Sequence, residues 1–375
     1  MTMTTKPRGL YLHTPFCVKK CNYCDFASFK EADCDWREKY IDTLCQEISL
    51  YADRGISIDT IFFGGGTPSL LTPCEFKRIV DRINDTFVVL PNTEFTIEAN
   101  PKTLTEEKLR AFMSLGVNRL SIGLQSIHEN EQKTLGRIHN YDDFLSTYHM
   151  ARRLGIKNIN VDLMYGIPDQ TMESFGKTLE SVTALEPEHI SLYGLILEEE
   201  TPLYNARDIL DFPTEDDECE MYYLATDLMR KKGYLHYEIS NYAKDGYHSR
   251  HNMKYWHADE YIGVGLAAHS YYQGIRYGNS CDTREYLAGD YAKYDMGDPL
   301  DKDSLAYEYV MLHLRLAEGF DLSEYRERFG LDFRQDREEI LSMMENNGLL
   351  TMENNRISLT ERGFYVSNNI LTELL

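Results

Sequence analysis

The chain of 375 residues carries 39 lysine and arginine side chains against 61 aspartate and glutamate side chains, which gives a formal net charge of −22. A surface this acidic repels phosphate groups, and no long basic stripe offsets it, so we expect neither nucleic acid nor an anionic membrane surface as a direct partner. No apolar run approaches the roughly 18 residues that span a bilayer, and the opening MTMTTKPRGLYLHTPF lacks the apolar stretch of a signal peptide, so we expect a cytoplasmic protein.

The first half of the chain alternates short apolar runs with longer stretches of helical spacing. The predicted strands cover residues 8–13, 58–63, 93–98, 117–123, 157–164 and 188–196. The predicted helices cover residues 35–54, 74–87, 105–115, 141–154 and 171–185. Such alternation predicts a parallel sheet with right-handed crossovers, and six units are too few for a closed eightfold barrel. The predicted fold is therefore α/β, an open, partial (β/α)6 barrel.

The pattern changes after Ile196. Residues 198–219 are acidic and rich in turns, residues 214–232 have helical spacing, and residues 234–290 are rich in tyrosine, histidine and glycine. From Asp303 onward the spacing predicts three helices, a two-stranded wing (GLLTMENNRISLT) and a last helix, which is the order of a winged-helix-like unit. Its acidic segments make a poor phosphate-binding face, so we expect a structural or protein-binding role. The predicted domains are a core of residues 1–197, an extension of residues 198–300 and a winged-helix-like unit of residues 301–375.

Three of the eight cysteines, Cys17, Cys21 and Cys24, lie close together in HTPFCVKKCNYCDF. In a cytoplasmic chain such a cluster indicates metal or redox chemistry, not a disulfide framework. Three thiolates spaced C-x3-C-x2-C in one loop can hold three irons of a cubane and leave the fourth iron open to a small ligand. The alternative is a zinc site with His13 as the fourth ligand, although the spacing is unlike that of a zinc-finger pair.

This C-x3-C-x2-C loop at the end of a first strand resembles the signature of radical S-adenosylmethionine (SAM) enzymes. The segments YLHTPFC, FFGGGTPSLL, IEANP, SIGLQS and NVDLMYGIPDQ narrow the resemblance to the oxygen-independent coproporphyrinogen III oxidase-like family. The resemblance runs from about residue 8 to the C-terminus. It implies a radical SAM barrel with a [4Fe–4S] cluster, whose open iron chelates the amino and carboxylate groups of SAM.

Several residues at strand ends suit this cofactor. The turn of Gly64, Gly65, Gly66 and Thr67 follows a strand and lets backbone amides approach a ligand closely, although a simple tight turn is the alternative. Glu98, Gln125 and Asp162 lie at or near the ends of three different strands, where parallel α/β folds build their sites. A carboxylate there can accept both ribose hydroxyl protons, and Gln125 can both donate and accept. Each of these residues is alternatively an ordinary polar residue or a helix cap.

Two further residues complete the predicted cofactor site. Arg137 lies in a loop after the fourth strand and can pair with a carboxylate of SAM or of a second ligand; its alternative is a solvated surface charge. Tyr11, six residues before Cys17, matches the cofactor-contacting tyrosine of the family that the sequence resembles.

Two departures from the family pattern indicate its haem-chaperone branch. Decarboxylases of this family carry a fourth cysteine two positions after the third, together with a long N-terminal extension; here that position is Phe26, and the first cluster cysteine is already residue 17. In their place stands His251-Asn252-Met253-Lys254-Tyr255-Trp256, the HNxxYW motif that marks the haem-chaperone branch. Haem needs an axial ligand such as histidine and flat apolar walls, which His251, Tyr255 and Trp256 can supply. An ordinary hydrogen-bonded histidine is the alternative for His251.

The resemblance therefore implies a chaperone that binds haem and passes it to apo-haemoproteins, with membrane-bound respiratory enzymes as expected recipients. The cluster and SAM would act as a structural or gating module that controls dimerisation or transfer, and contact with the membrane would run through protein partners. The alternative is an anaerobic coproporphyrinogen III dehydrogenase, which would cleave SAM and oxidatively decarboxylate its substrate. A radical SAM enzyme acting on an unrelated substrate is a third hypothesis.

Overall fold

The computed structural model describes residues 6–30, 34–291, 294–295 and 300–375. A single 12-stranded sheet organises most of these residues, in the order β14-β13-β12-β11-β1-β4-β5-β6-β7-β8-β10-β9. Its two outermost strands do not pair with each other, so the sheet is an open barrel. The α/β partial barrel predicted from the sequence is confirmed.

Six consecutive parallel strands form the centre of this sheet, as predicted. They are β1 (Arg8–Thr14), β4 (Ser57–Gly65), β5 (Val88–Ala99), β6 (Arg119–Gln125), β7 (Asn158–Tyr165) and β8 (His189–Gly194). Their side chains alternate between the barrel interior and the helical layer. Phe63 and Ile97, for example, lie in the main hydrophobic core under the helices. Glu98 on the same strand as Ile97 faces the other way, into the barrel.

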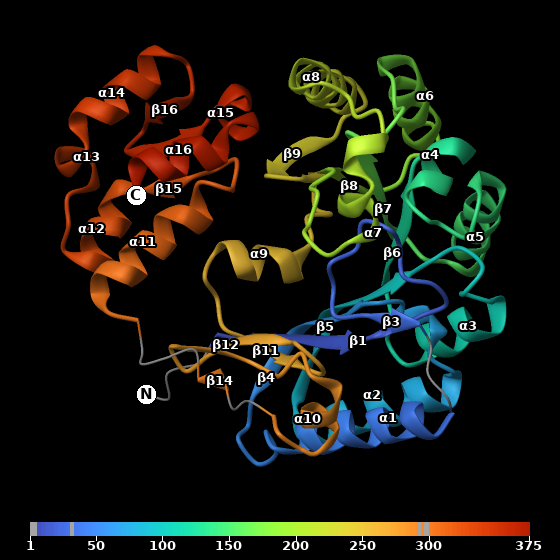
Figure 1. Ribbon diagram of the computed structural model, residues 1–375. Coiled ribbons are helices and arrows are strands. Elements are labelled where there is room, and N and C mark those ends of the chain that lie inside the picture. The colour runs from blue at the N-terminus through green and yellow to red at the C-terminus, as the bar shows by residue number, and fades with distance from the viewer. Residues whose placement is uncertain (1–5, 31–33, 292–293, 296–299) are drawn as a thin grey trace.

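Helices surround these strands as an outer layer (Figure 1). They are α1 (Cys34–Ser49), α2 (Pro73–Thr86), α3 (Glu106–Ser114), α4 (Glu129–Thr134), α5 (Tyr141–Leu154), α6 (Met172–Thr183) and α8 (Glu215–Lys231), with a single turn at Pro68–Leu70 before α2. Several begin with a capping box, in which the residue before the helix and the third helical residue each bond the other's backbone N–H through their side chains. Thr72 and Glu75 form one at α2. The predicted helices differ from these mainly at their ends.

The segment after residue 197 adds strands to both edges of the barrel. One edge receives β10 (Asn241–Ala243) and β9 (Leu235–Glu238); the other receives β11 (Tyr261–Val264), β12 (His269–Tyr272), β13 (Ile275–Gly278) and β14 (Tyr294–Asp295). β11 runs parallel to β1, so the parallel array has a seventh strand that the sequence pattern did not reveal. The remaining elements of this segment are α7 (Pro202–Asn205), a turn at Arg207–Ile209, α9 (Arg250–Trp256) and α10 (Thr283–Leu287).

The C-terminal residues form a separate packed unit beside the barrel, on the side of β9 and α9 (Figure 1). Its elements are α11 (Lys302–His313), β15 (Phe320–Asp321), α12 (Leu322–Phe329), α13 (Phe333–Asp336), α14 (Glu338–Asn346), β16 (Leu350–Glu353), β17 (Arg356–Leu359), α15 (Glu361–Tyr365) and α16 (Ser367–Leu374). The unit has its own hydrophobic core. The predicted order of helices and wing is present, and β15 adds a third strand to the wing. Across the described ranges, no helix has the length and apolarity needed to cross a bilayer.

Candidate cofactor site

The three clustered cysteines lie in a loop that begins at the carboxyl end of β1. Cys17 is the second residue of β2 (Phe16–Cys17), and the loop returns through β3 (Phe29–Lys30), which pairs with β2. His13 anchors this loop, because its Nε2 lies 2.8 Å from the carbonyl oxygen of Ala27. The hydroxyl of Tyr40 in turn donates to the carbonyl oxygen of His13 at 2.8 Å. The loop is therefore held against the barrel at both of its ends.

All three thiols line one cavity of about 290 Å³, at the carboxyl ends of the barrel strands. The Thr67 hydroxyl donates to Cys17 Sγ at 3.8 Å, and Arg137 Nη1 donates to Cys21 Sγ at 3.4 Å. Burial raises the pKa of the Cys17 and Cys24 thiols. A cation bound among the thiols would offset that effect, because it favours the thiolate form.

His13 does not join the thiols as a fourth ligand. Its Nε2 is engaged by Ala27, and its Nδ1 lies 3.1 Å from the hydroxyl of Tyr11. Within the described part of the chain, no three histidine, cysteine, aspartate or glutamate side chains are gathered as the ligands of a single metal ion would be. His13, which the zinc alternative needs as a fourth ligand, is thus engaged elsewhere, and this disfavours that alternative.

Two carboxylates face the cavity from deep in the barrel. Glu98 accepts a hydrogen bond from the backbone N–H of Gly65 at 3.2 Å. Asp162 accepts from Ser121 Oγ at 3.2 Å and from Asn160 Nδ2 at 2.7 Å. Removal from bulk water, and then the charge of Asp162, raise the pKa of Glu98 to about 8; removal from water likewise raises the pKa of Asp162. A ligand that donates hydrogen bonds to both carboxylates would relieve this unfavourable environment.

Gln125 also faces this cavity, with a strained backbone. Its φ of +66° is in the left-handed region, at a bulge where β6 shifts register against β7. The Oε1 atom of its buried side chain has no hydrogen-bond partner in the described chain. Strain and an unsatisfied buried oxygen together are typical of a ligand-binding position.

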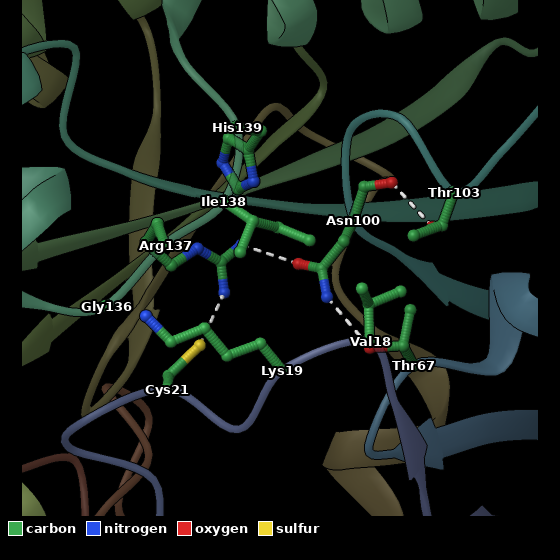
Figure 2. A pocket seen from close by; sticks show the side chains of 10 residues that line it. All are labelled: Val18, Lys19, Cys21, Thr67, Asn100, Thr103, Gly136, Arg137, Ile138 and His139. Carbon is green, nitrogen blue, oxygen red and sulfur yellow. Dashed lines mark hydrogen bonds between the residues drawn. The ribbon is translucent and has the colours of Figure 1, made fainter. Parts of the chain in front are cut away.

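Arg137 lies between the cysteine loop and the strand ends, and its guanidinium points toward both Cys21 and Asn100 (Figure 2). Its Nη2 donates to Asn100 Oδ1 at 2.5 Å and to the carbonyl oxygen of Gly123 at 2.7 Å. Its buried Nε has no partner in the described residues. The surface-charge alternative is therefore wrong for Arg137, which is part of the cavity wall.

The glycine-rich turn brings the chain into close contact with the cysteine loop. A Cβ on Gly65 would lie 2.6 Å from the His13 ring, and one on Gly66 would lie 2.7 Å from the carbonyl oxygen of Phe16. Gly65 and Gly66 line the cavity, whereas Gly64 packs against the ring of Tyr11. The turn thus holds the cysteine loop as well as forming part of the cavity wall.

Tyr11 lies inside the barrel beneath this turn and does not line the cavity itself. Its hydroxyl contacts His13, and its ring stacks on Phe62 with centroids 6.2 Å apart. In this structure Tyr11 supports the anchoring histidine. Its predicted contact with the cofactor stays a prediction.

His251 lies apart from the cavity, toward the amino ends of β1 and β4. It belongs to α9, which packs between the barrel and the C-terminal unit (Figure 1). Its Nδ1 lies 2.8 Å from Thr60 Oγ1, its Nε2 lies 2.8 Å from the hydroxyl of Tyr255, and its side chain is 1% exposed. Burial lowers the pKa of His251 to about 3, so the ring is neutral. An iron ligand here requires one of these two bonds to open, and the predicted haem contact stays a prediction.

Sequence reasoning did not single out several other residues of the cavity wall. Asn100 bridges Arg137 and Thr67, whose hydroxyl accepts from Asn100 Nδ2 at 2.9 Å. Tyr23 and Tyr193 contribute aromatic surface. Asn100 follows Glu98 within the segment IEANP, so its place just past a strand end was the available signal. No comparable signal in the sequence pointed to the two tyrosines.

Comparisons with known proteins agree with this architecture. The radical SAM superfamily model matches residues 11–182, and the HemN C-terminal domain model matches residues 300–366. The chain is 34% identical over 376 residues to the heme chaperone HemW of Lactococcus lactis, covering 100% of this chain and 98% of that protein. It is 33% identical to the proteins of the same name from Bacillus subtilis (98% and 99% covered) and Escherichia coli (97% of each).

Among solved structures, the coproporphyrinogen III oxidase HemN of Escherichia coli, a radical SAM enzyme, superimposes with a TM-score of 0.85. The match covers 99% of this chain and 90% of that chain at 23% sequence identity. At this identity the likeness concerns the fold, which includes both the barrel and the C-terminal unit.

Proposed function

The chain belongs to the HemW family of heme chaperones within the radical SAM superfamily, and from this premise we propose that it binds haem and delivers it to apo-haemoproteins. The proposal rests on sequence identity: the chain is more than 30% identical to proteins of that name along nearly its whole length. The matched length includes the HNxxYW segment. We propose in addition that the recipients are membrane-bound respiratory enzymes. We also propose that the protein acts in the cytoplasm and forms a homodimer.

Cys17, Cys21 and Cys24 would hold a [4Fe–4S] cluster in the cavity. Thr67 and Arg137 each donate a hydrogen bond to one of the sulfur atoms, and iron binds cysteines of such a loop as thiolates. When bound, the cluster supplies an open iron that can chelate a small ligand. The hydrogen bonds of His13 to Ala27 and of Tyr40 to His13 anchor the loop and would keep the thiolates in fixed positions.

SAM would lie beside the cluster along the strand ends. Glu98 and Asp162 accept hydrogen bonds from the ligand, and the unsatisfied Oε1 of Gln125 accepts another. The free Nε of Arg137 is placed to meet a ligand carboxylate from the same wall. These residues bind and orient the ligand, and the barrel interior keeps bulk water from their carboxylates.

Haem would contact His251 after a local rearrangement of α9. The neutral ring does not have to lose a proton before it binds iron, because its pKa lies near 3. Its two nitrogens are engaged by Thr60 and Tyr255, so the haem-binding form differs from the present one at these bonds. We propose accordingly that the extension of residues 198–300 handles haem, that residues 1–197 hold the cluster and SAM, and that residues 301–375 contact protein partners.

The alternative enzyme function is not favoured. Phe26 occupies the place of the fourth cysteine, and its side chain is 66% exposed at the rim of the cavity. Oxidative decarboxylation requires a substrate held with its reacting hydrogen at near-attack distance from the abstracting group. An exposed phenyl ring at this position offers no polar group with which to fix a tetrapyrrole's propionates.

The test is anaerobic reconstitution of the cluster, followed by haem titration and transfer to an apo-haemoprotein. We expect a Soret band that shifts from the protein to the recipient on mixing. The same preparation, supplied with SAM, a reductant and coproporphyrinogen III, should yield no protoporphyrinogen. Protoporphyrinogen formed over many turnovers, or absence of haem binding, would contradict the proposal.

A further inference from the structure

A buried chain of hydrogen bonds connects the cavity to the start of α9. We call it the interior relay, and its members are Asp162, Asn160, His189, Tyr237 and Ser249. Asn160 Nδ2 lies 2.7 Å from Asp162 Oδ1, His189 Nδ1 lies 2.6 Å from Asn160 Oδ1, and His189 Nε2 lies 2.7 Å from the Tyr237 hydroxyl. The backbone N–H of Ser249 donates to that hydroxyl at 3.1 Å. Ser249 is the N-cap residue of α9.

The direction of every bond in the interior relay follows from its two ends. The N–H of Ser249 can only donate. Asn160 donates from its Nδ2 to Asp162, which leaves its Oδ1 to accept from His189. Tyr237 therefore accepts from Ser249 and donates to His189 Nε2, and His189 Nδ1–H donates to Asn160. Burial lowers the pKa of His189, so the ring has the neutral form that this arrangement needs. Bonds that all point the same way polarise one another in a low-dielectric interior.

The members of the interior relay beyond Asp162 are all buried. Asn160 is 2% exposed, His189 0%, Tyr237 6% and Ser249 0%. A change in the hydrogen bonding of His189, which is 0% exposed, must therefore be absorbed by Asn160 and Tyr237, because bulk water cannot replace a lost partner there. Asn160 is further fixed by Ser121 and Ser191, which contact its amide at 2.8 and 3.1 Å.

A second contact holds the first turn of α9 to the barrel. Glu94 accepts from the backbone N–H of Arg250 at 3.2 Å and from that of His251 at 3.1 Å. Glu94 lies on β5, the strand that also carries Glu98. Three successive backbone N–H groups, those of residues 249–251, are thus satisfied by side chains of the barrel and not by the helix itself.

We propose that ligand binding at Asp162 is transmitted through the interior relay to the N-cap of α9, and that His189 and Tyr237 are positioning residues that couple the cavity to His251. This inference rests on the proposed function for the identity of the two ligands. A ligand hydroxyl that occupies Asp162 competes with Asn160 for its oxygens. Asn160 then shifts, His189 and Tyr237 follow, and the bond from the Ser249 N–H to the Tyr237 hydroxyl is weakened or lost. His251, which is bonded to Thr60 and Tyr255, lies two residues after Ser249 in the first turn of α9.

The first experiment needs no haem. Amide hydrogen exchange of residues 249–251 is measured in the cluster-loaded native protein with and without SAM, in the absence of reductant. We expect SAM to change the exchange rate of these amides at least threefold. In Tyr237→Phe, which removes only the hydroxyl between His189 and Ser249, SAM should still bind but should leave these amides unchanged. Equal exchange in the native protein with and without SAM would overturn the inference.

The second experiment measures coupling between the two ligands. The dissociation constant for haem is determined with and without saturating SAM; we expect a ratio of at least about fivefold, the lower end of typical coupling. Tyr237→Phe should reduce this ratio to about one. Tyr148→Phe is the matched control, because it removes a buried hydroxyl that donates to Leu185 in the outer helical layer, and it should keep the native ratio. If Tyr237→Phe kept the ratio of the unsubstituted protein, the coupling through the interior relay would be refuted. If the unsubstituted protein bound no haem, the proposed function would be refuted, and the exchange experiment would decide whether the interior relay transmits SAM binding.

Discussion

Gly66 offers a direct test of how the glycine-rich turn supports the cysteine loop. A Cβ at this position would lie 2.7 Å from the carbonyl oxygen of Phe16 and 2.9 Å from that of Thr14. Ordinary contacts of a Cβ begin at 3.4 Å, so the two segments would have to separate by about 0.7 Å. Because the obstacles are backbone atoms of the segment that leads into Cys17, no side-chain rotation can relieve the contact.

We therefore expect Gly66→Ala to lower the free energy of unfolding by about 1–3 kcal/mol, the usual cost of overpacking. Separation also stretches the bond from the Gly66 N–H to the Thr14 carbonyl oxygen, now 2.7 Å. The displaced loop should in addition hold iron less well. The assays are urea unfolding of the metal-free protein and iron content per chain after anaerobic reconstitution.

Gly176→Ala is the matched control for this substitution. Gly176 lies inside α6, and a Cβ there would meet only Leu224 Cδ2, at 3.7 Å. Alanine should stabilise the helix by about 0.5–1 kcal/mol, and iron content should stay at the native value. If Gly66→Ala unfolded at the native urea concentration and bound the full complement of iron, the supporting role inferred for the turn would be wrong.

Four further predictions concern the bound groups. Cys17→Ala should abolish the cluster measured by iron analysis, whereas Cys219→Ala should not; a full cluster in the former would contradict the assignment. The affinity for SAM should rise about tenfold per pH unit up to pH 8 and then level off, because protonated Glu98, whose pKa is about 8, cannot accept both ribose hydroxyls; calorimetric titration of Glu98→Gln should show no such pH dependence. Asp162→Ala should weaken SAM binding by about 1.5–3 kcal/mol through loss of charge-assisted hydrogen bonds, and an unchanged affinity would place SAM elsewhere. His251→Ala should alter the Soret band or lower haem occupancy while the cluster stays intact, and a normal haem spectrum would mean that His251 is only structural.

The residues at the carboxyl ends of the strands were accessible from the sequence, because parallel strands bring their ends to one edge of a sheet. Glu98, Gln125 and Asp162 do line one cavity. The backbone strain at Gln125 was not accessible, since it depends on a register shift between β6 and β7. Nor was the contact of Arg137 with Cys21, which joins two loops that only the folded barrel brings together.

The surroundings of His251 were also beyond the reach of local pattern. The HNxxYW segment forms the short helix α9, whose position depends on Glu94 and Thr60 on strands much earlier in the chain. The same holds for β11, a strand of only four residues whose run YIGV gives a weak signal. Such short elements are defined by their tertiary partners more than by their own propensity.

The pairing of β11 with β1 has a consequence for the order in which the protein is built. β1 is the first strand to leave the ribosome, yet one of its two neighbours is synthesised only after most of the chain. Residues directly after β11 then brace the anchor of the cysteine loop: Leu266 N–H donates to the hydroxyl of Tyr40, which itself holds His13. A nascent chain shorter than this point has an open edge at β1 and an unsupported loop. We therefore expect a cluster to be loaded into this loop only after residues 261–266 have been synthesised and have packed beside β1 and Tyr40.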